Sequence, residues 1–228
     1  LLMSAKDQNK DQTYFLHQLS QEQLKNTLFP LGGYTKKQVR KLARKFDLPT
    51  QNKEESMGIC FVGEVPMEKF LKSKIKGNPG DIVFSNGKKA GRHIGLGFYT
   101  VGQKVSILSS QFLKSRKNEP LFVVRKDLEN NRLIIGFNND HSLYKKEIEI
   151  KNFHWINKIH FKGKLKCKFR LRHRQELQTG FLRYGNKNSE FKIISKRKQR
   201  AVSPGQFAVI YKKRFFYGYE CLGGGEIF

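Results

Sequence analysis

Basic and apolar side chains alternate without a break along residues 164–174. The apolar set comprises Leu165, Cys167, Phe169, Leu171 and His173, and the basic set comprises Lys164, Lys166, Lys168, Arg170, Arg172 and Arg174. Successive side chains of a β-strand point to opposite faces, so a period of two gives each set its own face. The segment is therefore predicted to be a half-buried strand with a basic outer face and with Cys167 in the core.

Short apolar runs separated by turn residues continue from this segment to the C-terminus. Residues 191–194 and 207–211 are two such runs, and Pro204-Gly205 marks a turn before the second. Several short strands with turn signals between them are typical of a small barrel. We therefore predict a β-barrel over residues 141–228, with Cys221 also in its core.

Positive charge is the main compositional bias of the chain. The 228 residues include 45 Lys and Arg against 19 Asp and Glu, a formal net charge of +26. Residues 151–214 alone hold 19 Lys and Arg against 2 Asp and Glu. Such an excess repels itself unless a polyanion shares the surface, so nucleic acid is the leading class of partner. A basic surface that meets only solvent is the alternative.

The cysteines and the apolar runs narrow the class of protein further. Three cysteines, spaced far apart, are too few for a disulfide framework and favour a reducing, cytoplasmic setting. No Cys-x-x-Cys pair suggests a metal site. No apolar run approaches the roughly 20 residues of a membrane-spanning helix, so no membrane partner is expected.

The first 64 residues carry signals of helices. Asp11 is predicted to cap a short helix, and two capping-box patterns follow, Ser20 with Gln23 and Thr35 with Gln38. From residue 65 to 140 the signals change to strands.

In that second stretch Asn86-Gly87 predicts a hairpin with a type I′ turn. Residues 96–101, 121–124 and 133–135 are predicted to be further strands.

Cys60 lies in a stretch, residues 55–63, that has Gly58 before it and Gly63 after it. Glycine permits backbone angles that a Cβ forbids, so this stretch can turn sharply. Lys53 lies upstream, and a nearby cation would favour the reactive thiolate form of Cys60. A small buried side chain between two turn glycines is the alternative interpretation.

Seven segments together resemble one family, the tRNA-specific 2-thiouridylases or MnmA family. They are residues 9–16 (NKDQTYFL), 29–33 (FPLGG), 56–63 (SMGICFVG), 99–103 (YTVGQ), 172–175 (RHRQ), 201–206 (AVSPGQ) and 221–225 (CLGGG). The resemblance covers nearly the whole chain. It implies an α+β multidomain fold in three parts: residues 1–64 as the helical end of a PP-loop α/β adenylating domain with the cysteine loop, residues 65–140 as a small β-rich central domain, and residues 141–228 as a tRNA-binding β-barrel.

The resemblance also implies a reaction. Members of the family use ATP to adenylate the C2 oxygen of the wobble uridine in certain tRNAs. A cysteine persulfide then delivers sulfur to C2, and AMP leaves. Cys60 matches the persulfide-bearing cysteine. The sulfur comes from a donor protein, either a sulfur-relay protein or a cysteine desulfurase.

Six further positions match residues that contact tRNA in the family: Lys10, Asp11, Gln12, Arg172, His173 and Gln206. Lys and Arg suit phosphates, while Gln suits a base edge or a ribose. His173 falls in the apolar phase of its segment, where a packed core ring is the alternative.

The sequence departs from the family in what it lacks. The Ser-Gly-Gly-Val-Asp-Ser phosphate loop and the first catalytic cysteine do not occur in these residues, and the family pattern places both before Leu1. We therefore expect ATP to be bound by a preceding region and this chain alone to be inactive. The alternative function is a non-catalytic tRNA-binding module left from a split or decayed thiouridylase.

Overall fold

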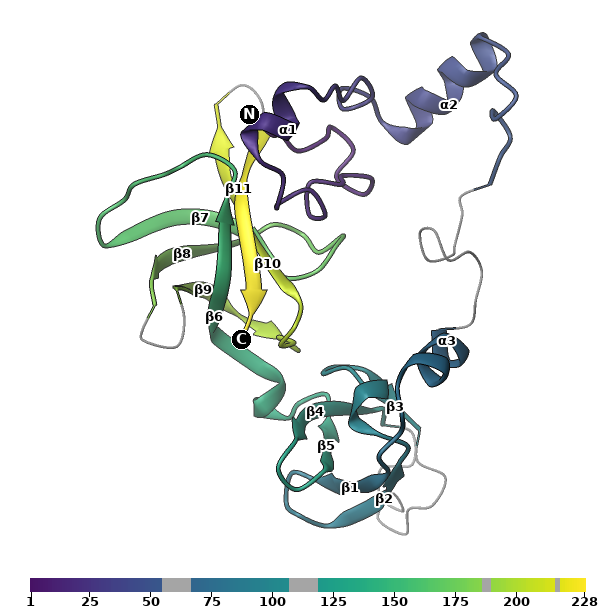
Figure 1. Cartoon of the computed structure of the whole chain (residues 1–228), viewed down its shortest axis with the longest axis vertical. Helices are drawn as coiled ribbons and strands as arrows, with labels where there is room; N and C mark the ends of the chain where they lie inside the picture. Colours follow the sequence, from purple (N-terminus) through teal and green to yellow (C-terminus); the bar gives the residue numbers. More distant parts are fainter. Residues whose placement is uncertain (55–66, 107–118, 186–189, 216–217) are drawn as a thin grey trace. The chain divides into compact units, whose positions relative to one another are not determined.

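The computed structural model describes residues 1–54, 67–106, 119–185, 190–215 and 218–228 (Figure 1). Contacts divide the chain into two units. The first contains residues 1–54, 146–198 and 204–228, and the second contains residues 55–145 and 199–203.

A closed six-stranded barrel forms the main body of the first unit, with the strand order β10-β11-β6-β9-β8-β7. Its strands are β6 Tyr144–Trp155, β7 Lys164–Arg170, β8 Gln178–Tyr184, β9 Phe191–Arg200, β10 Phe207–Arg214 and β11 Gly218–Ile227. The barrel predicted for the C-terminal part is therefore confirmed. Neighbouring strands such as β7 and β8 run antiparallel, which allows short connections.

The N-terminal segment pairs with and packs against this barrel. Met3 forms an antiparallel bridge with Glu220 of β11, and the backbone N–H of Cys221 donates to the carbonyl of Leu2 at 2.8 Å. Leu2 and Tyr14 share one apolar cluster with Val209, Tyr211 and Cys221. The first 54 residues thus lie with the barrel, while the domain boundary at residue 64 stays a prediction because residues 55–66 are outside the described part.

Both predicted capping boxes are confirmed in the helices of this unit. Helix α1 spans Gln21–Lys25 after Ser20, and α2 spans Lys36–Lys45 after Thr35. In each, the cap side chain accepts from the backbone N–H three residues on, and the Gln side chain reaches back to the cap. The helix predicted after Asp11 is wrong, because residues 13–18 form turns and bends rather than a helix.

The second unit contains a five-stranded sheet with the order β2-β1-β5-β4-β3. Its elements are α3 Met67–Lys74, β1 Gly80–Phe84, β2 Lys89–His93, the 3-10 turn η1 Leu96–Phe98, β3 Lys104–Val105, β4 Leu121–Asp127, β5 Arg132–Phe137 and the 3-10 turn η3 His141–Leu143. Strands β1 and β5 pair in parallel, whereas the other pairs are antiparallel. Val123, Leu133 and Ile135 are fully buried in the core of this sheet.

Two local predictions in this unit need correction. The hairpin at Asn86-Gly87 is present, but only Gly87 has a positive φ, so the turn is not type I′. The Asn86 side chain instead accepts from the N–H of Lys88 at 3.1 Å. The strand predicted over residues 96–101 is absent: residues 96–98 form a 3-10 turn after Gly95 at φ 142, and residues 99–101 lead irregularly to Gly102 at φ 84.

No helix in the described part of the chain is long and apolar enough to span a membrane.

Candidate nucleic-acid interface

Strand β7 ends four residues before the alternating pattern does. Its last residue is Arg170, and the chain then turns through residues 171–174, with Arg174 at a φ of 66°. Lys164 and Lys166 are exposed as predicted, but Arg170 is only 2% exposed. The prediction of a basic outer face is therefore wrong for Arg170, because the N-terminal segment covers that end of the strand.

The partner of Arg170 is Asp11, 159 residues earlier in the chain. Its Nη1 donates to Asp11 Oδ2 at 2.9 Å, and the two side chains are 3% and 0% exposed. The other guanidinium nitrogen, Nη2, donates to Gln8 Oε1 at 2.9 Å, and the guanidinium lies 5.6 Å from the centre of the Tyr211 ring. Removing one partner of such a buried pair typically costs about 3–5 kcal/mol, because it leaves an uncompensated charge.

The Asp11 carboxylate also closes the turn on which it lies. Its Oδ1 accepts from the backbone N–H of Ala5 at 3.2 Å and of Thr13 at 3.3 Å. The Thr13 hydroxyl lies 2.8 Å from Oδ2 and 3.2 Å from the Tyr211 hydroxyl. The predicted tRNA contact of Asp11 stays a prediction, and its carboxylate lies inside the protein rather than on the surface.

Tyr14 and His173 make a second attachment between the same two segments. The Tyr14 hydroxyl lies within hydrogen-bond distance of the carbonyls of Leu171, at 3.3 Å, and Phe207, at 3.0 Å. The His173 ring packs 4.5 Å from the ring of Phe15, and its Nε2 lies 3.3 Å from the carbonyl of Asp11. His173 is thus half-buried against aromatic rings, and its predicted tRNA contact stays a prediction.

The structure brings the predicted tRNA-contacting positions together from three segments. Lys10 is half-buried and Gln12 exposed on the N-terminal turn, Arg172 is exposed after β7, and Gln206 is exposed before β10. Strands β7 and β10 are neighbours, with Val209 opposite Arg170. The roles of these four residues in tRNA binding stay predictions, whereas the adjacency of the segments that carry them is observed.

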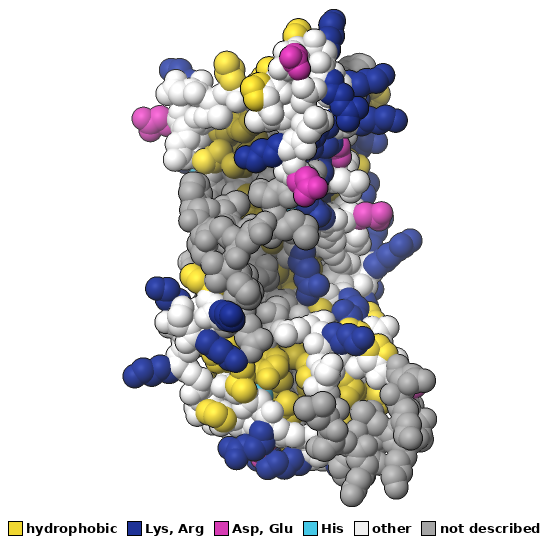
Figure 2. All heavy atoms as spheres, turned by 90° about the vertical axis from the view of Figure 1, so that its right-hand side faces the viewer, with side chains coloured by type: hydrophobic (Ala, Val, Ile, Leu, Met, Phe, Trp, Pro, Cys, Tyr) yellow, Lys and Arg dark blue, Asp and Glu magenta, His cyan; other side chains and the backbone are white. Residues whose placement is uncertain are grey.

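Lysine and arginine dominate the exposed charges of the barrel strands. Lys and Arg side chains also predominate over Asp and Glu on the face of the molecule shown in Figure 2. Exposed cations on the barrel strands are Lys145, Lys146, Lys164, Lys166, Arg183, Lys196, Arg197, Lys198, Lys212 and Lys213. A surface of this kind attracts a phosphate backbone without selecting a sequence.

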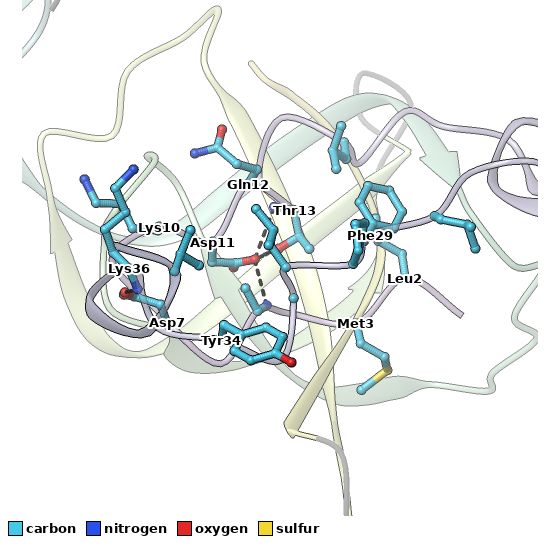
Figure 3. Close-up of a pocket in the computed structure, with 17 residues that line it drawn as sticks. Leu2, Met3, Asp7, Lys10, Asp11, Gln12, Thr13, Phe29, Tyr34 and Lys36 are labelled. Carbon is cyan, nitrogen blue, oxygen red and sulfur yellow. Dashed lines mark hydrogen bonds between the residues drawn. The ribbon is translucent and has the colours of Figure 1, made fainter. Parts of the chain in front are cut away.

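A pocket of about 530 Å³ lies beside the Lys10–Gln12 turn, and all of its lining residues belong to the first 39 positions (Figure 3). Apolar side chains such as Leu2 and Phe29 line it together with Lys10 and Lys36. At its polar end Asp7 Oδ2 accepts from the backbone N–H of Lys36, at 2.9 Å, and this hydrogen bond lowers the pKa of the Asp7 carboxyl.

The described residues do not fit the phosphates of ATP. The N-terminus of α2 follows Gly32-Gly33, but its N–H groups at Lys36 and Gln38 already donate to Asp7 and Thr35. The other glycine run, residues 223–225, lies within β11, where a Cβ on Gly223 would come 2.0 Å from the His154 carbonyl oxygen. Neither run leaves a row of open amides for a phosphate.

The two described cysteines are buried, as the sequence predicts. Burial raises the pKa of both Cys167 and Cys221 to about 12, so neither supplies a thiolate at neutral pH. Cys60, the predicted persulfide carrier, lies outside the described residues.

Three family models match successive parts of the chain. Family models described as tRNA methyl transferase HUP domain, tRNA methyl transferase PRC-barrel domain and aminomethyltransferase beta-barrel domain match residues 1–64, 68–137 and 145–227. The chain is 40% identical over 227 residues to the tRNA-specific 2-thiouridylase MnmA of Hahella chejuensis, and 39% identical to those of Pseudomonas fluorescens and Legionella pneumophila. These alignments cover 99% of this chain and 60%, 59% and 61% of the relatives.

The chain belongs to the tRNA-specific 2-thiouridylase family. Although two of the models are described by the term methyl transferase, the relatives that align over 99% of this chain carry the 2-thiouridylase name. The chain spans about 60% of the length of these relatives. Their whole activity is therefore a matter of proposal for this chain.

The sequence pattern does not mark the buried residues that attach the N-terminal turn to the barrel. Arg170 lies in the basic phase of an alternating strand, and nothing in that pattern distinguishes it from Lys168 or Arg172. Thr13 and Tyr14, which hold the turn to the barrel, likewise carry no local signal. A pairing over 159 residues becomes visible only once the fold places the two segments together.

Proposed function

We propose that this chain takes part in 2-thiolation of the wobble uridine of tRNA and contributes the tRNA-binding surface and the sulfur-carrying cysteine. The observation that carries the proposal is that Tyr14 joins the three segments that carry Lys10 and Gln12, Arg172, and Gln206, through its contacts with the Leu171 and Phe207 carbonyls. The family membership supplies the class of reaction.

The side chains differ in what they offer an RNA. Lys10 and Arg172 suit phosphates, whereas Gln12 and Gln206 can reach a base edge or a ribose hydroxyl. In the proposed reaction the outer sulfur of a Cys60 persulfide attacks C2 of the adenylated uridine, and AMP leaves with the C2 oxygen. A second thiol, the family's first catalytic cysteine, then breaks the S–S bond and forms a disulfide with Cys60, which leaves the sulfur on C2. A sulfur-relay protein or a cysteine desulfurase loads this sulfur. The ATP-dependent step is assigned to no residue of this chain, because the described residues do not fit the nucleotide.

A gene deletion and a binding assay together test the proposal. Deleting the gene should remove 2-thiouridine from the cell's tRNA, measured by mass spectrometry of digested tRNA. The purified chain should shift unmodified tRNA in a gel, and the affinity should fall steeply as salt is raised. With ATP and a persulfide donor added, the chain alone should release no AMP.

Each outcome separates the proposal from its alternative. If 2-thiouridine persists in the deletion strain while the chain still binds tRNA, the chain is a non-catalytic tRNA-binding module. If the chain binds no tRNA at any salt concentration, both functions are wrong. Release of AMP that depends on tRNA would show an ATP site that the described residues do not reveal.

A further inference from the structure

We propose that the buried Asp11–Arg170 pair is a positioning device that holds the Lys10–Gln12 turn in the shape in which Lys10 and Gln12 meet RNA. The inference rests on the proposed function, because it concerns how the same tRNA-binding surface is built. It assigns Asp11 and Arg170 to positioning rather than to contact.

The first observation is the alternation of exposure along the turn. Gln12 is exposed and Lys10 half-buried, whereas the Asp11 side chain between them has no exposed surface. In Figure 3 the Asp11 carboxylate points into its cluster of hydrogen bonds, and the Gln12 amide points away from that cluster. A carboxylate placed outward between these side chains would repel the phosphate that Lys10 attracts.

The second observation is that the pair ties the turn together at both of its ends. Ala5 and Thr13 donate to the Asp11 carboxylate, and Gln8 accepts from the Arg170 guanidinium. Three points along residues 5–13 thus depend on the same two charged groups. A neutral side chain at Asp11 would weaken these hydrogen bonds together rather than one at a time.

The third observation is the position of the pair relative to both tRNA-binding segments. Asp11 directly follows Lys10, and Arg170 lies two residues before Arg172. The ion pair therefore sets the spacing between Lys10 and Arg172, which are remote in sequence. A backbone of phosphates has a regular spacing, so cations on separate segments bind it well only if their separation is held constant.

Stability alone is a poor explanation for this pair. A buried ion pair is often no more stabilising than well-packed apolar residues of the same volume. Arg170 Nε has no hydrogen-bond partner among the described residues, so hydrogen bonds offset only part of the free-energy cost of removing the guanidinium from water. What the pair offers instead is a directional contact between the turn and strand β7.

A double-mutant cycle on tRNA binding tests the inference with the 228-residue chain. The variants are Asp11→Asn, Lys10→Ala and the double variant, and Kd for unmodified tRNA is measured over a series of salt concentrations. Asp11→Asn removes one negative charge and so makes the chain more positive, yet it should raise Kd by roughly tenfold and lower the salt slope by about one contact. Lys10→Ala should then have little further effect in the Asp11→Asn background.

The control is Glu220→Gln, which breaks another Arg–carboxylate pair in the same unit. Glu220 is 1% exposed and accepts from Arg214 Nε at 2.6 Å, and the Arg214 side chain is 39% exposed. The substitution should lower thermal stability, while leaving the salt slope and the effect of Lys10→Ala unchanged. A difference between Asp11→Asn and this control separates positioning from general destabilisation.

A second variant and a second measurement distinguish a loss of positioning in Asp11→Asn from a failure of that variant to fold. Arg170→Lys keeps the charge but cannot reach Asp11 and Gln8 together, so it should weaken binding in the same direction. Hydrogen exchange should be faster at the Ala5 and Thr13 amides of both variants.

Additive effects of Lys10→Ala and Asp11→Asn on Kd, or an unchanged salt slope in Asp11→Asn, would overturn the inference. Failure of the unaltered chain to bind tRNA would instead overturn the proposed function.

Discussion

The ring of His17 lies 4.7 Å from the ring of Phe207, and its Nε2 has no hydrogen-bond partner among the described residues. Its Nδ1 lies 2.7 Å from the Tyr14 carbonyl, which can only accept, so Nδ1 carries the proton in the neutral ring. His17 is 5% exposed, and this burial lowers its pKa below the ordinary value, although the Tyr14 hydrogen bond acts in the opposite direction.

This arrangement predicts that acid destabilises the first unit. With a lowered pKa, the folded chain binds fewer protons than the unfolded chain below about pH 6.5, the ordinary pKa of histidine. The contribution of His17 to stability is therefore present above that pH and decreases as the pH falls toward the folded pKa. Urea unfolding between about pH 5 and pH 8 should show the midpoint falling on the acid side.

The control for this prediction is His17→Asn, which keeps a donor for the Tyr14 carbonyl but does not titrate. The variant should be less stable at neutral pH, because it loses contact with Phe207, and its midpoint should depend less on pH. An equally steep pH dependence in the variant would show that another group is responsible.

Cys60→Ser should abolish thiolation and leave tRNA affinity nearly unchanged. A serine oxygen keeps the size of the side chain but cannot carry a transferable sulfur. The codon is changed in the chromosome, and 2-thiouridine is measured in total tRNA. The matched variant Cys167→Ala alters a buried thiol whose pKa is about 12, so it should preserve thiolation at some cost in stability. Near-normal 2-thiouridine in the Ser variant would exclude Cys60 as the sulfur carrier.

Arg172→Ala should flatten the salt dependence of tRNA binding. Each cation that neutralises a phosphate adds close to one unit to the slope of log K against log salt, so the slope should fall by about one. Lys213→Ala is the control, because Lys213 lies six residues beyond Phe207 on β10, which is about 20 Å along the strand. Equal loss of slope in both variants would indicate a diffuse basic surface instead of a site at Arg172.

Gly223→Ala should destabilise the barrel by more than about 3 kcal/mol. Gly223 has a φ of 138°, and a Cβ there would lie 2.0 Å from the His154 carbonyl oxygen of the neighbouring strand. Gly163→Ala is the comparison, since Gly163 also has a positive φ, 69°, but open space around it. That variant should cost only the left-handed strain of about 1–2 kcal/mol, and chemical denaturation measures both.

The sequence by itself determined the features that depend on local pattern. The capping boxes of α1 and α2 follow from a hydroxyl and a Gln three residues apart, which satisfy each other's backbone groups wherever the helix lies. The barrel follows from short apolar runs with turns between them, and the burial of Cys167 follows from its apolar phase. The family follows from seven segments in order along the chain.

Only the tertiary structure decided what covers each surface. The alternation in residues 164–174 separates two faces of a strand, but it does not state that the N-terminal turn lies over Arg170 and leaves Arg172 exposed. The alternation also does not predict that the Asp11 side chain is buried between Lys10 and Gln12. Nor does it predict that Gln206 lies near Tyr14, whose hydroxyl contacts the carbonyl of the next residue, Phe207. The physical reason is that periodicity reports which side a residue takes within its own element, whereas burial of a charge depends on a partner that another part of the chain supplies.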